Sequence, residues 1–403
     1  MNSWQLLLIA AVVVGFAADT TLSVLNRRAQ NSDETRSYDD AELARALQYK
    51  ATNFSFSLVS ESLSTLLTVI ALAFGWIGAW DNFVVERFAS PVWQALAFFA
   101  GLGLVMTVIG LPFDVYRTFS IEKRFGFNKT TPSVFILDQV KGLLIGALLG
   151  GAVIAALVWI YSALGGWFWL VAWLTLTAIS FVMLAWGTSV FTPLFNKLIP
   201  LPDGELRSAL VDYCHSQGYE VSRLFVMDGS KRSTKANAYF AGLGGSKTIV
   251  LYDTLIEKLS TEEVVAVLAH EVGHFRLRHI LTRFLAGTGQ TLVMTSVLGW
   301  ALSQGALSAS LGGLHLDFQL GLVAFLLFLS PTSTLIGWGV NSLSRKHEFE
   351  ADQFSIRTYP GPHLASGLTK ISTDALTDPS PHPAYVAVNY SHPPLKERVA
   401  ALA

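Results

Sequence analysis

The sequence predicts a mostly α-helical membrane protein that carries a small α+β domain in water. Of its 403 residues, 52% are hydrophobic and only 14% are charged, and the mean hydropathy is +0.46. Soluble domains carry about 25% charged residues, so the composition indicates a chain that lies largely in a bilayer. Long charge-free runs are separated by polar segments, and the polar segment 191–283 reads as a mixture of helix and strand.

Seven spans follow from the charge-free runs, because about 20 mostly apolar residues are needed to cross the hydrocarbon core. The run 142–196 is too long for one span and is divided at SALGGW, residues 162–167. The predicted spans are 1–18, 63–80, 88–113, 142–161, 167–190, 284–316 and 318–344. The first lacks the basic start of a secretory signal, so we expect it to be a span that is retained.

These spans divide the chain into four parts. Residues 1–190 hold spans 1 to 5 with their loops, and 284–344 hold spans 6 and 7. The polar segment 191–283 and the C-terminal segment 345–403 remain to build a domain in water.

Lys and Arg residues concentrate in alternate loops, which predicts the orientation in the membrane. The loops after spans 1 and 3 carry Arg27, Arg28, Arg36, Arg45 and Lys50, and then Arg117, Lys123, Arg124 and Lys129. The loop after span 2 offers only Arg87. We therefore expect the N-terminus outside the cell or in a lumen, and both polar segments on the cytosolic side of a bacterial cytoplasmic or an ER membrane.

Charge and cysteine content exclude other classes of function. The formal net charge of -1 gives no indication of nucleic-acid binding. The single cysteine, Cys214, excludes an intrachain disulfide and a thiolate-rich metal site.

The polar segment 191–283 has recognisable elements. Residues 205–218 have the pattern of an amphipathic helix, and VSRLFVMD, 221–228, that of a strand. KANAYFAGLGGSKTIVLYD, 235–253, predicts two strands around a Gly-Gly-Ser turn. Ser260 and Glu263 form a capping-box pattern, which predicts a helix that starts near Thr261.

That helix contains HEVGH, residues 270–274. Residues four apart are separated by about 40° on a helix, so His270 and His274 share a face and can bind one Zn²⁺. Glu271 lies about 100° round from His270, where it is not a ligand but can act as general base for the water that attacks a peptide bond. The motif therefore predicts a hydrolytic zinc site.

A catalytic zinc site needs a third protein ligand. One class of zinc proteases supplies a Gly and a His after the motif, but Leu277 and Ile280 occupy those positions here. His279, five residues after His274, is expected to point away from it, as a polar residue near the membrane surface.

A carboxylate beyond the last span is the other source of a third ligand. NSLSRKHEFEAD, 341–352, is separated from HEVGH by two spans, which return the chain to the same side. Glu348, Glu350 and Asp352 are therefore candidates. Glu348 and Asp352 share a helix face, so one can bind the metal while the other holds a histidine ring. A solvated run of charges is the alternative.

Several motifs together resemble the type I CaaX prenyl endopeptidases, a family of seven-span membrane zinc metalloproteases. They are HEVGH, SRKHEFEAD (344–352), YSHPPLKER (390–398), PLFNKLIPLPDGEL (193–206), KANAYFAGL (235–243), IVLYDTL (249–255) and SIEKRFGFNKTT (120–131). The resemblance implies seven helices that enclose a water-filled chamber. It also implies an α+β zinc metalloprotease domain built from the loop between spans 5 and 6 and the C-terminal tail. Polar groups at membrane depth are tolerated where they line water.

The resemblance implies a role for each matching residue. His270, His274 and Glu348 would bind one Zn²⁺ per chain, Glu271 would be the base, Asp352 would orient a zinc-binding histidine, and His392 would stabilise the oxyanion.

The resemblance also implies how a substrate is held. Asn237, Ala238 and Tyr239 would form an edge strand that pairs with the substrate main chain, which fixes the scissile bond without requiring a particular sequence. Arg345 and Arg398 are candidates for binding a substrate carboxylate or for buried ion pairs.

The expected substrate is a CaaX-type prenylated peptide or another hydrophobic or membrane-associated protein, cut by a monomer in the lipid bilayer. A heat-shock-type quality-control protease shares the HExxH motif but has fewer spans, and the long N-terminal half argues against it. A non-catalytic scaffold on the same fold is disfavoured by the intact Glu271. An intramembrane protease of the site-2 type is disfavoured because Glu262, Glu263, Arg276 and Arg278 flank the motif.

Overall fold

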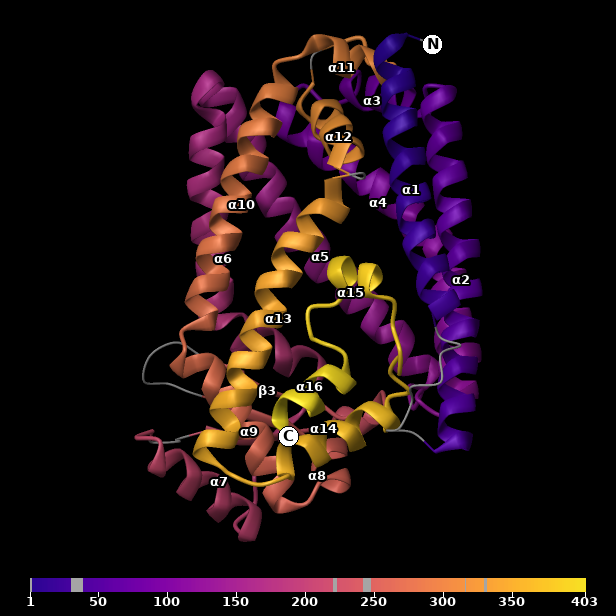
Figure 1. The fold of residues 1–403 in the computed structure, drawn as a ribbon. Coiled ribbons are helices and arrows are strands. Elements are labelled where there is room, and N and C mark those ends of the chain that lie inside the picture. The colour runs from indigo at the N-terminus through magenta and orange to yellow at the C-terminus, as the bar shows by residue number, and fades with distance from the viewer. Residues whose placement is uncertain (1, 30–38, 220–222, 242–247, 316, 330–331) are drawn as a thin grey trace.

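Figure 1 shows long helices that run along the molecule and a cluster of strands and short helices at one end, opposite the N-terminus. The structure is a computed structural model, and it describes residues 2–29, 39–219, 223–241, 248–315, 317–329 and 332–403. The long part contains α1 (Ser3–Ala29), α2 (Asp40–Ala73), α3 (Trp76–Val85), α4 (Pro91–Tyr116), a π-helical stretch (Arg117–Glu122), α5 (Pro132–Leu164), α6 (Phe168–Phe195), α10 (His279–Leu302), α11 (Gly305–Ser310), α12 (Phe318–Leu329) and α13 (Ser333–Thr358).

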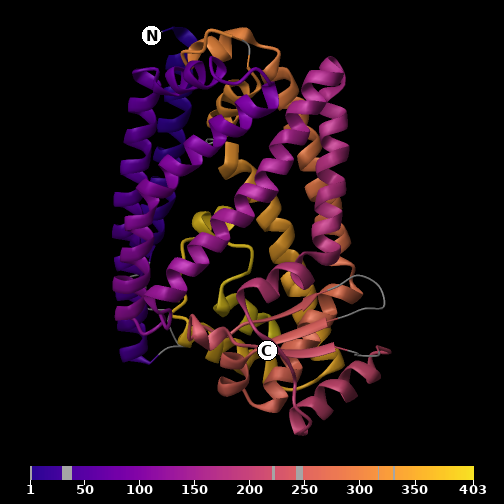
Figure 2. The ribbon, with the colours of Figure 1, turned by 180° about the vertical axis from the view of Figure 1, so that it is seen from behind.

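Among the described residues, four helical stretches are long and apolar enough to cross a membrane: 3–29, 40–73, 91–122 and 132–187. The last contains α5 and α6, which are joined by a turn at Gly165–Trp167 and pack against each other (Figure 2). The break predicted at 162–167 is thus confirmed. A fifth stretch arises if α12 and α13, which meet at a bend of 67°, form one span. The mostly helical membrane fold is confirmed, and the count of seven spans stays a prediction.

The predicted position of the second span, 63–80, is wrong. The helix α2 starts at Asp40, where Asp39 and Glu42 form a capping box, and the chain turns at Gly75, which has a φ of 67°. Charged residues that we assigned to a loop therefore lie inside a long helix. The charge-free stretch was a poor guide because two charged residues of this helix, Lys50 and Glu61, line a polar cavity.

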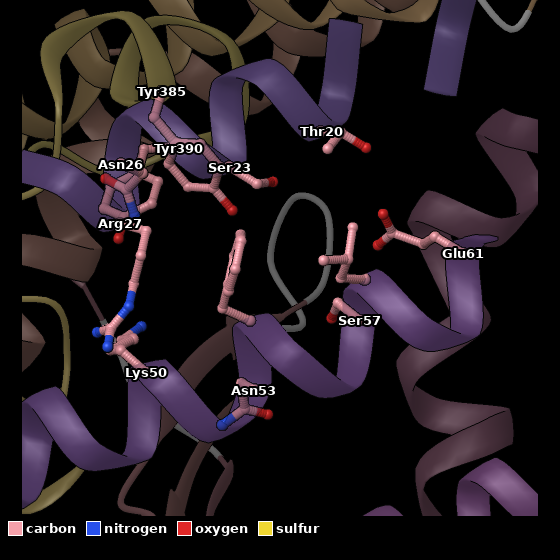
Figure 3. Close-up of a pocket in the computed structure, with 12 residues that line it drawn as sticks. Thr20, Ser23, Asn26, Arg27, Lys50, Asn53, Ser57, Glu61, Tyr385 and Tyr390 are labelled. Carbon is pink, nitrogen blue, oxygen red and sulfur yellow. The ribbon is translucent and has the colours of Figure 1, made fainter. Parts of the chain in front are cut away.

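A polar cavity of about 230 Å³ receives those charges (Figure 3). It lies between α1, α2 and α15 (Pro383–Asn389). Arg27, Lys50, Glu61 and Tyr385 are among the residues that line it. Ionisable side chains are tolerated in membrane helices where they face such a cavity rather than lipid.

Spans 6 and 7 also differ from the prediction. The helix α10 ends at Leu302 rather than near 316, and α11 follows as a short helix packed on α1 and α12. The helix α13 continues past residue 344 to Thr358, because no Gly or Pro interrupts it after Gly339. One helix therefore carries the chain from the membrane part into the predicted zinc site.

A four-stranded sheet supports the other end of the molecule. Its strands are β1 (Leu198–Pro200), β2 (Arg223–Met227), β3 (Ala238–Ala241) and β4 (Thr248–Tyr252), in the order β1-β2-β4-β3. The central pair is parallel and both outer pairs are antiparallel. The helices beside it are α7 (Glu205–Ser216), α8 (Asp253–Lys258) and α9 (Thr261–Arg276). The predicted elements are confirmed; the Gly-Gly-Ser turn lies outside the described residues.

The sheet and α9 share a core in which Leu210, Ile249, Leu255 and Leu268 are buried. The C-terminal helices complete this end: α14 (His363–Asp374) packs on α9, and α16 (Leu395–Leu402) packs on α13 and α14. The motif helix is therefore held from several sides.

Candidate active site

The start of α9 is fixed by the predicted capping box. The Ser260 hydroxyl accepts from the Glu263 N–H at 3.3 Å, and the Glu263 carboxylate accepts from the Ser260 N–H at 2.9 Å. The same carboxylate accepts hydrogen bonds from Ser366 and Lys370 on α14. Burial raises the pKa of Glu263, but these hydrogen bonds outweigh burial and hold the pKa below its usual range. The cap therefore also ties α9 to α14.

The helices α9 and α13 cross at Gly273. A Cβ at this position would lie 3.1 Å from Phe354 Cβ and 3.2 Å from Ala351 Cα, which is closer than ordinary contact. About two turns earlier on α9, the Ala266 carbonyl accepts a hydrogen bond of 2.9 Å from Ser355 Oγ. The close crossing sets one face of α13 against the histidine face of α9.

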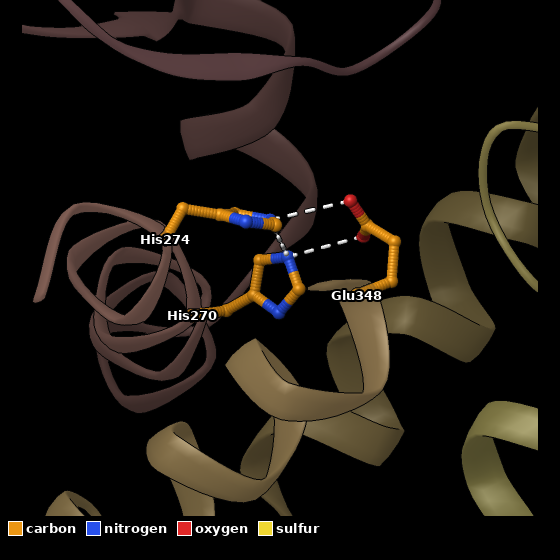
Figure 4. Close-up of side chains that lie close together, drawn as sticks. All are labelled: His270, His274 and Glu348. Carbon is orange, nitrogen blue, oxygen red and sulfur yellow. Dashed lines mark hydrogen bonds and ion pairs between the residues drawn. The ribbon is translucent and has the colours of Figure 1, made fainter. Parts of the chain in front are cut away.

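Figure 4 shows three side chains that converge at this crossing, His270 and His274 from α9 and Glu348 from α13. His270 Nε2 lies 3.3 Å from Glu348 Oε2, and His274 Nε2 lies 3.2 Å from Glu348 Oε1. The two Nε2 atoms are 3.2 Å apart. The structure thus brings the three predicted ligands together across 74 residues of chain, counted from His274 to Glu348.

These three residues fit a zinc ion. Tetrahedral bonds of about 2.0–2.1 Å place ligand atoms about 3.3 Å apart. The two histidine nitrogens are 3.2 Å apart, and each lies 3.2–3.3 Å from one of the two carboxylate oxygens of Glu348. Glu348 Oε2 is buried without a hydrogen-bond partner among the described residues. Two imidazoles and one carboxylate are also a donor set of catalytic zinc sites.

The carboxylate of Asp352 contacts the ring nitrogen of His270 that is farther from the ligand group. Asp352 Oδ1 lies 2.8 Å from His270 Nδ1, so the ring presents Nε2 to the ligand group. Burial alone lowers the pKa of His270, but the hydrogen bonds with Asp352 and Glu348 outweigh it and raise the pKa to about 9. Without a metal ion this ring therefore carries an additional proton, which a metal ion must displace in order to bind.

Arg398 forms an ion pair with that carboxylate, and its role in substrate binding stays a prediction. Its Nε donates to Asp352 Oδ2 at 2.8 Å and its Nη2 to Oδ1 at 2.6 Å, and the residue is only 8% exposed. The alternative, a buried ion pair, describes it correctly. Arg345 is structural as well, because its Nη1 donates to the carbonyls of Val386, Ala387 and Tyr390 at the end of α15.

Two further predicted residues lie at the site. Glu271 is half-buried on α9, next in sequence to His270. His392 Nε2 lies 3.5 Å from Glu348 Oε1, while its side chain is 64% exposed. Ser391 Oγ lies 3.0 Å from His392 Nδ1 and restrains the ring.

The predicted edge strand is at an edge of the sheet. Ala238 and Tyr239 belong to β3, which pairs only with β4 among the described strands. Asn237 precedes the strand, and its carbonyl accepts from the Tyr252 N–H at 3.1 Å. The strand β3 also packs against α9, the helix that carries the histidines.

The prediction that His279 points away from His274 is wrong. Its Nδ1 lies 2.9 Å from His274 Nδ1. The extrapolation failed because α9 ends at Arg276 and Arg278 turns the chain with a φ of 59°. Burial and the neighbouring histidines lower the pKa of His279 to about 4, so this ring is neutral at pH 7.

One other residue at the site, Arg283, was missed, and a second, Glu350, has a different role from the one considered. Arg283, on α10, places Nη2 at 3.4 Å from Glu348 Oε1. Glu350, considered only as a ligand, instead contacts His279 Nε2 at 2.9 Å. No sequence signal marks Arg283, because it lies nine residues beyond the motif and after the turn.

Comparison with known protein families accounts for almost the whole chain. The family described as CAAX prenyl protease N-terminal, five membrane helices, matches residues 23–197. Peptidase family M48 matches residues 200–403. The boundary between the two matches falls at β1, just after α6.

Similar proteins carry the same description. The CAAX prenyl protease 1 homolog of Arabidopsis thaliana is 35% identical over 376 residues, which cover 91% of this chain and 88% of that protein. The homolog of Oryza sativa subsp. japonica is 39% identical over 316 residues, 78% of this chain and 74% of that protein. The human homolog is 29% identical over 411 residues, 90% of this chain and 85% of that protein.

A solved structure has the same fold. The crystal structure of S. mikatae Ste24p matches with a TM-score of 0.93 and 28% sequence identity, over 100% of this chain and 99% of that one. The agreement extends through the membrane helices as well as the site. The chain therefore belongs to the CAAX prenyl protease branch of peptidase family M48, and it is a membrane metalloprotease.

Proposed function

We propose that the protein is a zinc endopeptidase that cleaves CaaX-type prenylated or other membrane-associated peptides, with one zinc ion held by His270, His274 and Glu348. The observation that carries this proposal is that the Nε2 atoms of His270 and His274 lie 3.2 Å apart and that each lies 3.2–3.3 Å from a carboxylate oxygen of Glu348. The names of the relatives support the substrate class. A zinc ion bound there supplies Lewis acidity toward the scissile carbonyl and lowers the pKa of water.

The residues around the ligands transfer protons, stabilise the oxyanion and hold the substrate. Glu271 takes a proton from the attacking water and returns it to the leaving amine. His392, whose ring is exposed beside the ligands, donates a hydrogen bond to the developing oxyanion. The main chain of Asn237, Ala238 and Tyr239 holds the substrate as an added strand.

The membrane arrangement is part of the proposal. We place the N-terminus outside or in a lumen and the zinc site toward the cytosol, in a monomer whose helices enclose a water-filled chamber. The polar cavity that includes Lys50 and Glu61 supports such a chamber, because those side chains need water or partners at membrane depth. The family match over residues 23–197 argues against the heat-shock type of protease.

Metal content and cleavage test the catalytic roles together. Because there is one three-ligand site, purified protein should hold about one zinc per chain. It should also cleave a CaaX peptide. Glu271→Gln should abolish cleavage and retain zinc, whereas Glu348→Ala should lose zinc. Glu257→Gln, on the exposed face of α8, is the matched control and should behave as the parent protein. Full activity of Glu271→Gln would contradict its role as base.

A second experiment tests the substrate class. A farnesylated CaaX peptide and its unprenylated form are compared at equal concentration with the same protein. Faster cleavage of the farnesylated peptide supports a lipid-dependent substrate. Equal rates would assign the enzyme to hydrophobic peptides in general.

A further inference from the structure

A second group of buried polar side chains lies directly behind the ligand group. His279 and His347 are 3% and 4% exposed, and Glu350, whose side chain is 42% exposed, contacts His279. His279 connects two other residues through hydrogen bonds. Its Nδ1 is 2.9 Å from His274 Nδ1, and its Nε2 is 2.9 Å from Glu350 Oε2. His274 in turn directs its Nε2 toward Glu348.

The local fold explains why these groups meet. Arg278 adopts a left-handed conformation, which ends α9 and lets α10 begin at His279 with its ring against His274. On α13, Glu350 is two residues beyond Glu348 and so lies about 200° round the helix axis. One carboxylate therefore faces the ligand group and the other reaches His279.

We propose that His279 and Glu350 form a relay that fixes the tautomer and the orientation of His274 as a zinc ligand. This inference rests on the zinc site of the proposed function. If His274 gives Nε2 to the metal, its only proton is on Nδ1, which must donate. His279 Nδ1 must then accept, so the His279 proton is on Nε2 and donates to Glu350. Each proton in this series of hydrogen bonds is thus assigned to one nitrogen.

The same cluster offers the ligand types of a second metal site, since suitable atoms of His279, His347 and Glu350 lie within 4.8 Å of one another. The geometry opposes that alternative. The rings of His279 and His347 are stacked, with centroids 4.0 Å apart and an interplanar angle of 8°. Metals bind imidazole nitrogens in the ring plane, and the lone pairs of two parallel rings cannot converge on one ion. Both nitrogens of His279 are also already engaged.

The relay gives the two histidine ligands unequal support. His270 is held by a carboxylate directly, at 2.8 Å, whereas His274 is held by a carboxylate through an intervening imidazole. Groups that orient a ligand in this way typically contribute about 10–100-fold to metal affinity. His279 and Glu350 are therefore positioning residues, and their loss should weaken zinc binding without changing the number of zinc ions per chain.

Zinc affinity of the full-length protein in detergent, measured by competition with a chelator, tests the relay. His279→Phe keeps a ring to stack on His347 but removes both hydrogen bonds, and should weaken zinc binding about 10–100-fold. His279→Gln keeps a hydrogen-bond acceptor and a donor on one neutral group, so its zinc affinity should stay within a few-fold of that of the parent protein. His347→Phe is the matched control and should leave the affinity unchanged.

Several results would overturn the proposal. These are parent-like affinity in His279→Phe, an equal loss in His279→Gln, or a loss as large in His347→Phe. Two zinc ions per chain would assign the cluster to a second metal instead. If His279→Phe fails to fold, Glu350→Ala serves in its place and must weaken zinc binding, while Lys346→Ala, which removes the exposed partner of Glu350 at 3.9 Å, must not. Absence of zinc from the parent protein would refute the proposed function itself, which is a distinguishable outcome.

Discussion

Replacing Gly273 by alanine tests whether the crossing of α9 and α13 sets the geometry of the ligand group. The new Cβ would lie 3.1 Å from Phe354 Cβ and 3.2 Å from Ala351 Cα, so the helices must separate by a few tenths of an ångström. Metal sites tolerate deviations of about 0.2 Å in ligand distance. We therefore expect Gly273→Ala to bind zinc about 10–100-fold more weakly, an effect as large as losing a group that orients a ligand.

The free energy of unfolding should change less than zinc affinity. Alanine gains about 1 kcal/mol over glycine in a helix, and overpacking costs about 1–3 kcal/mol, so the net loss is about 0–2 kcal/mol from these two terms. Gly367→Ala is the matched control: it is also a helical glycine packed on α9, but its Cβ would meet nothing closer than 3.5 Å. That variant should gain stability and keep zinc.

The assay is zinc competition together with thermal unfolding of both variants in the same detergent. Parent-like zinc affinity in Gly273→Ala, with a melting temperature equal to that of Gly367→Ala, would refute the reasoning. It would mean that α13 can shift to accommodate the new Cβ without moving the carboxylate of Glu348.

Three further predictions concern the surroundings of the site. Arg398→Met removes both guanidinium hydrogen bonds from the buried carboxylate of Asp352 and leaves it only the contact with His270 among the described residues, so thermal unfolding should show a loss of about 3–5 kcal/mol. A variant that melts as the parent does but binds substrate poorly would support a substrate role. Lys370→Met removes a partner that keeps Glu263 ionised. A carboxyl with a lowered pKa stabilises the fold above its unfolded value near 4.3, and this contribution disappears as pH falls through the folded value. The melting difference from the parent should therefore be present at pH 7 and shrink below pH ~4, and a difference independent of pH would contradict it. Ser260→Ala should cost about 1 kcal/mol by loss of the cap, measured by the same unfolding assay.

The sequence was sufficient where a local rule applies. The capping box placed the start of α9, and helical spacing placed His270 and His274 on one face. The third ligand was harder, because spacing left Glu348, Glu350 and Asp352 open and only the resemblance to a family distinguished them. The structure separates them by direction: two face the ligand group or its first histidine, and one faces away.

The failures come from contacts that no local pattern encodes. The second span was misplaced because Lys50 was assigned to the loop after span 1, whereas a polar cavity allows it to lie within α2. His279 was misread because one left-handed residue, Arg278, ended the helix on which the extrapolation relied. Both errors arise where tertiary surroundings override the preference of a segment taken alone.

The division of the zinc site between α9 and α13 has a consequence for biogenesis. The third ligand reaches the first two only after α10, α11 and α12 have been inserted and folded, since these helices lie between His274 and Glu348 in the chain. A chain that has not completed its membrane part therefore lacks a full metal centre and cannot hydrolyse peptides. Latency during synthesis is thus provided by topology, and the uptake of metal reports that insertion is complete.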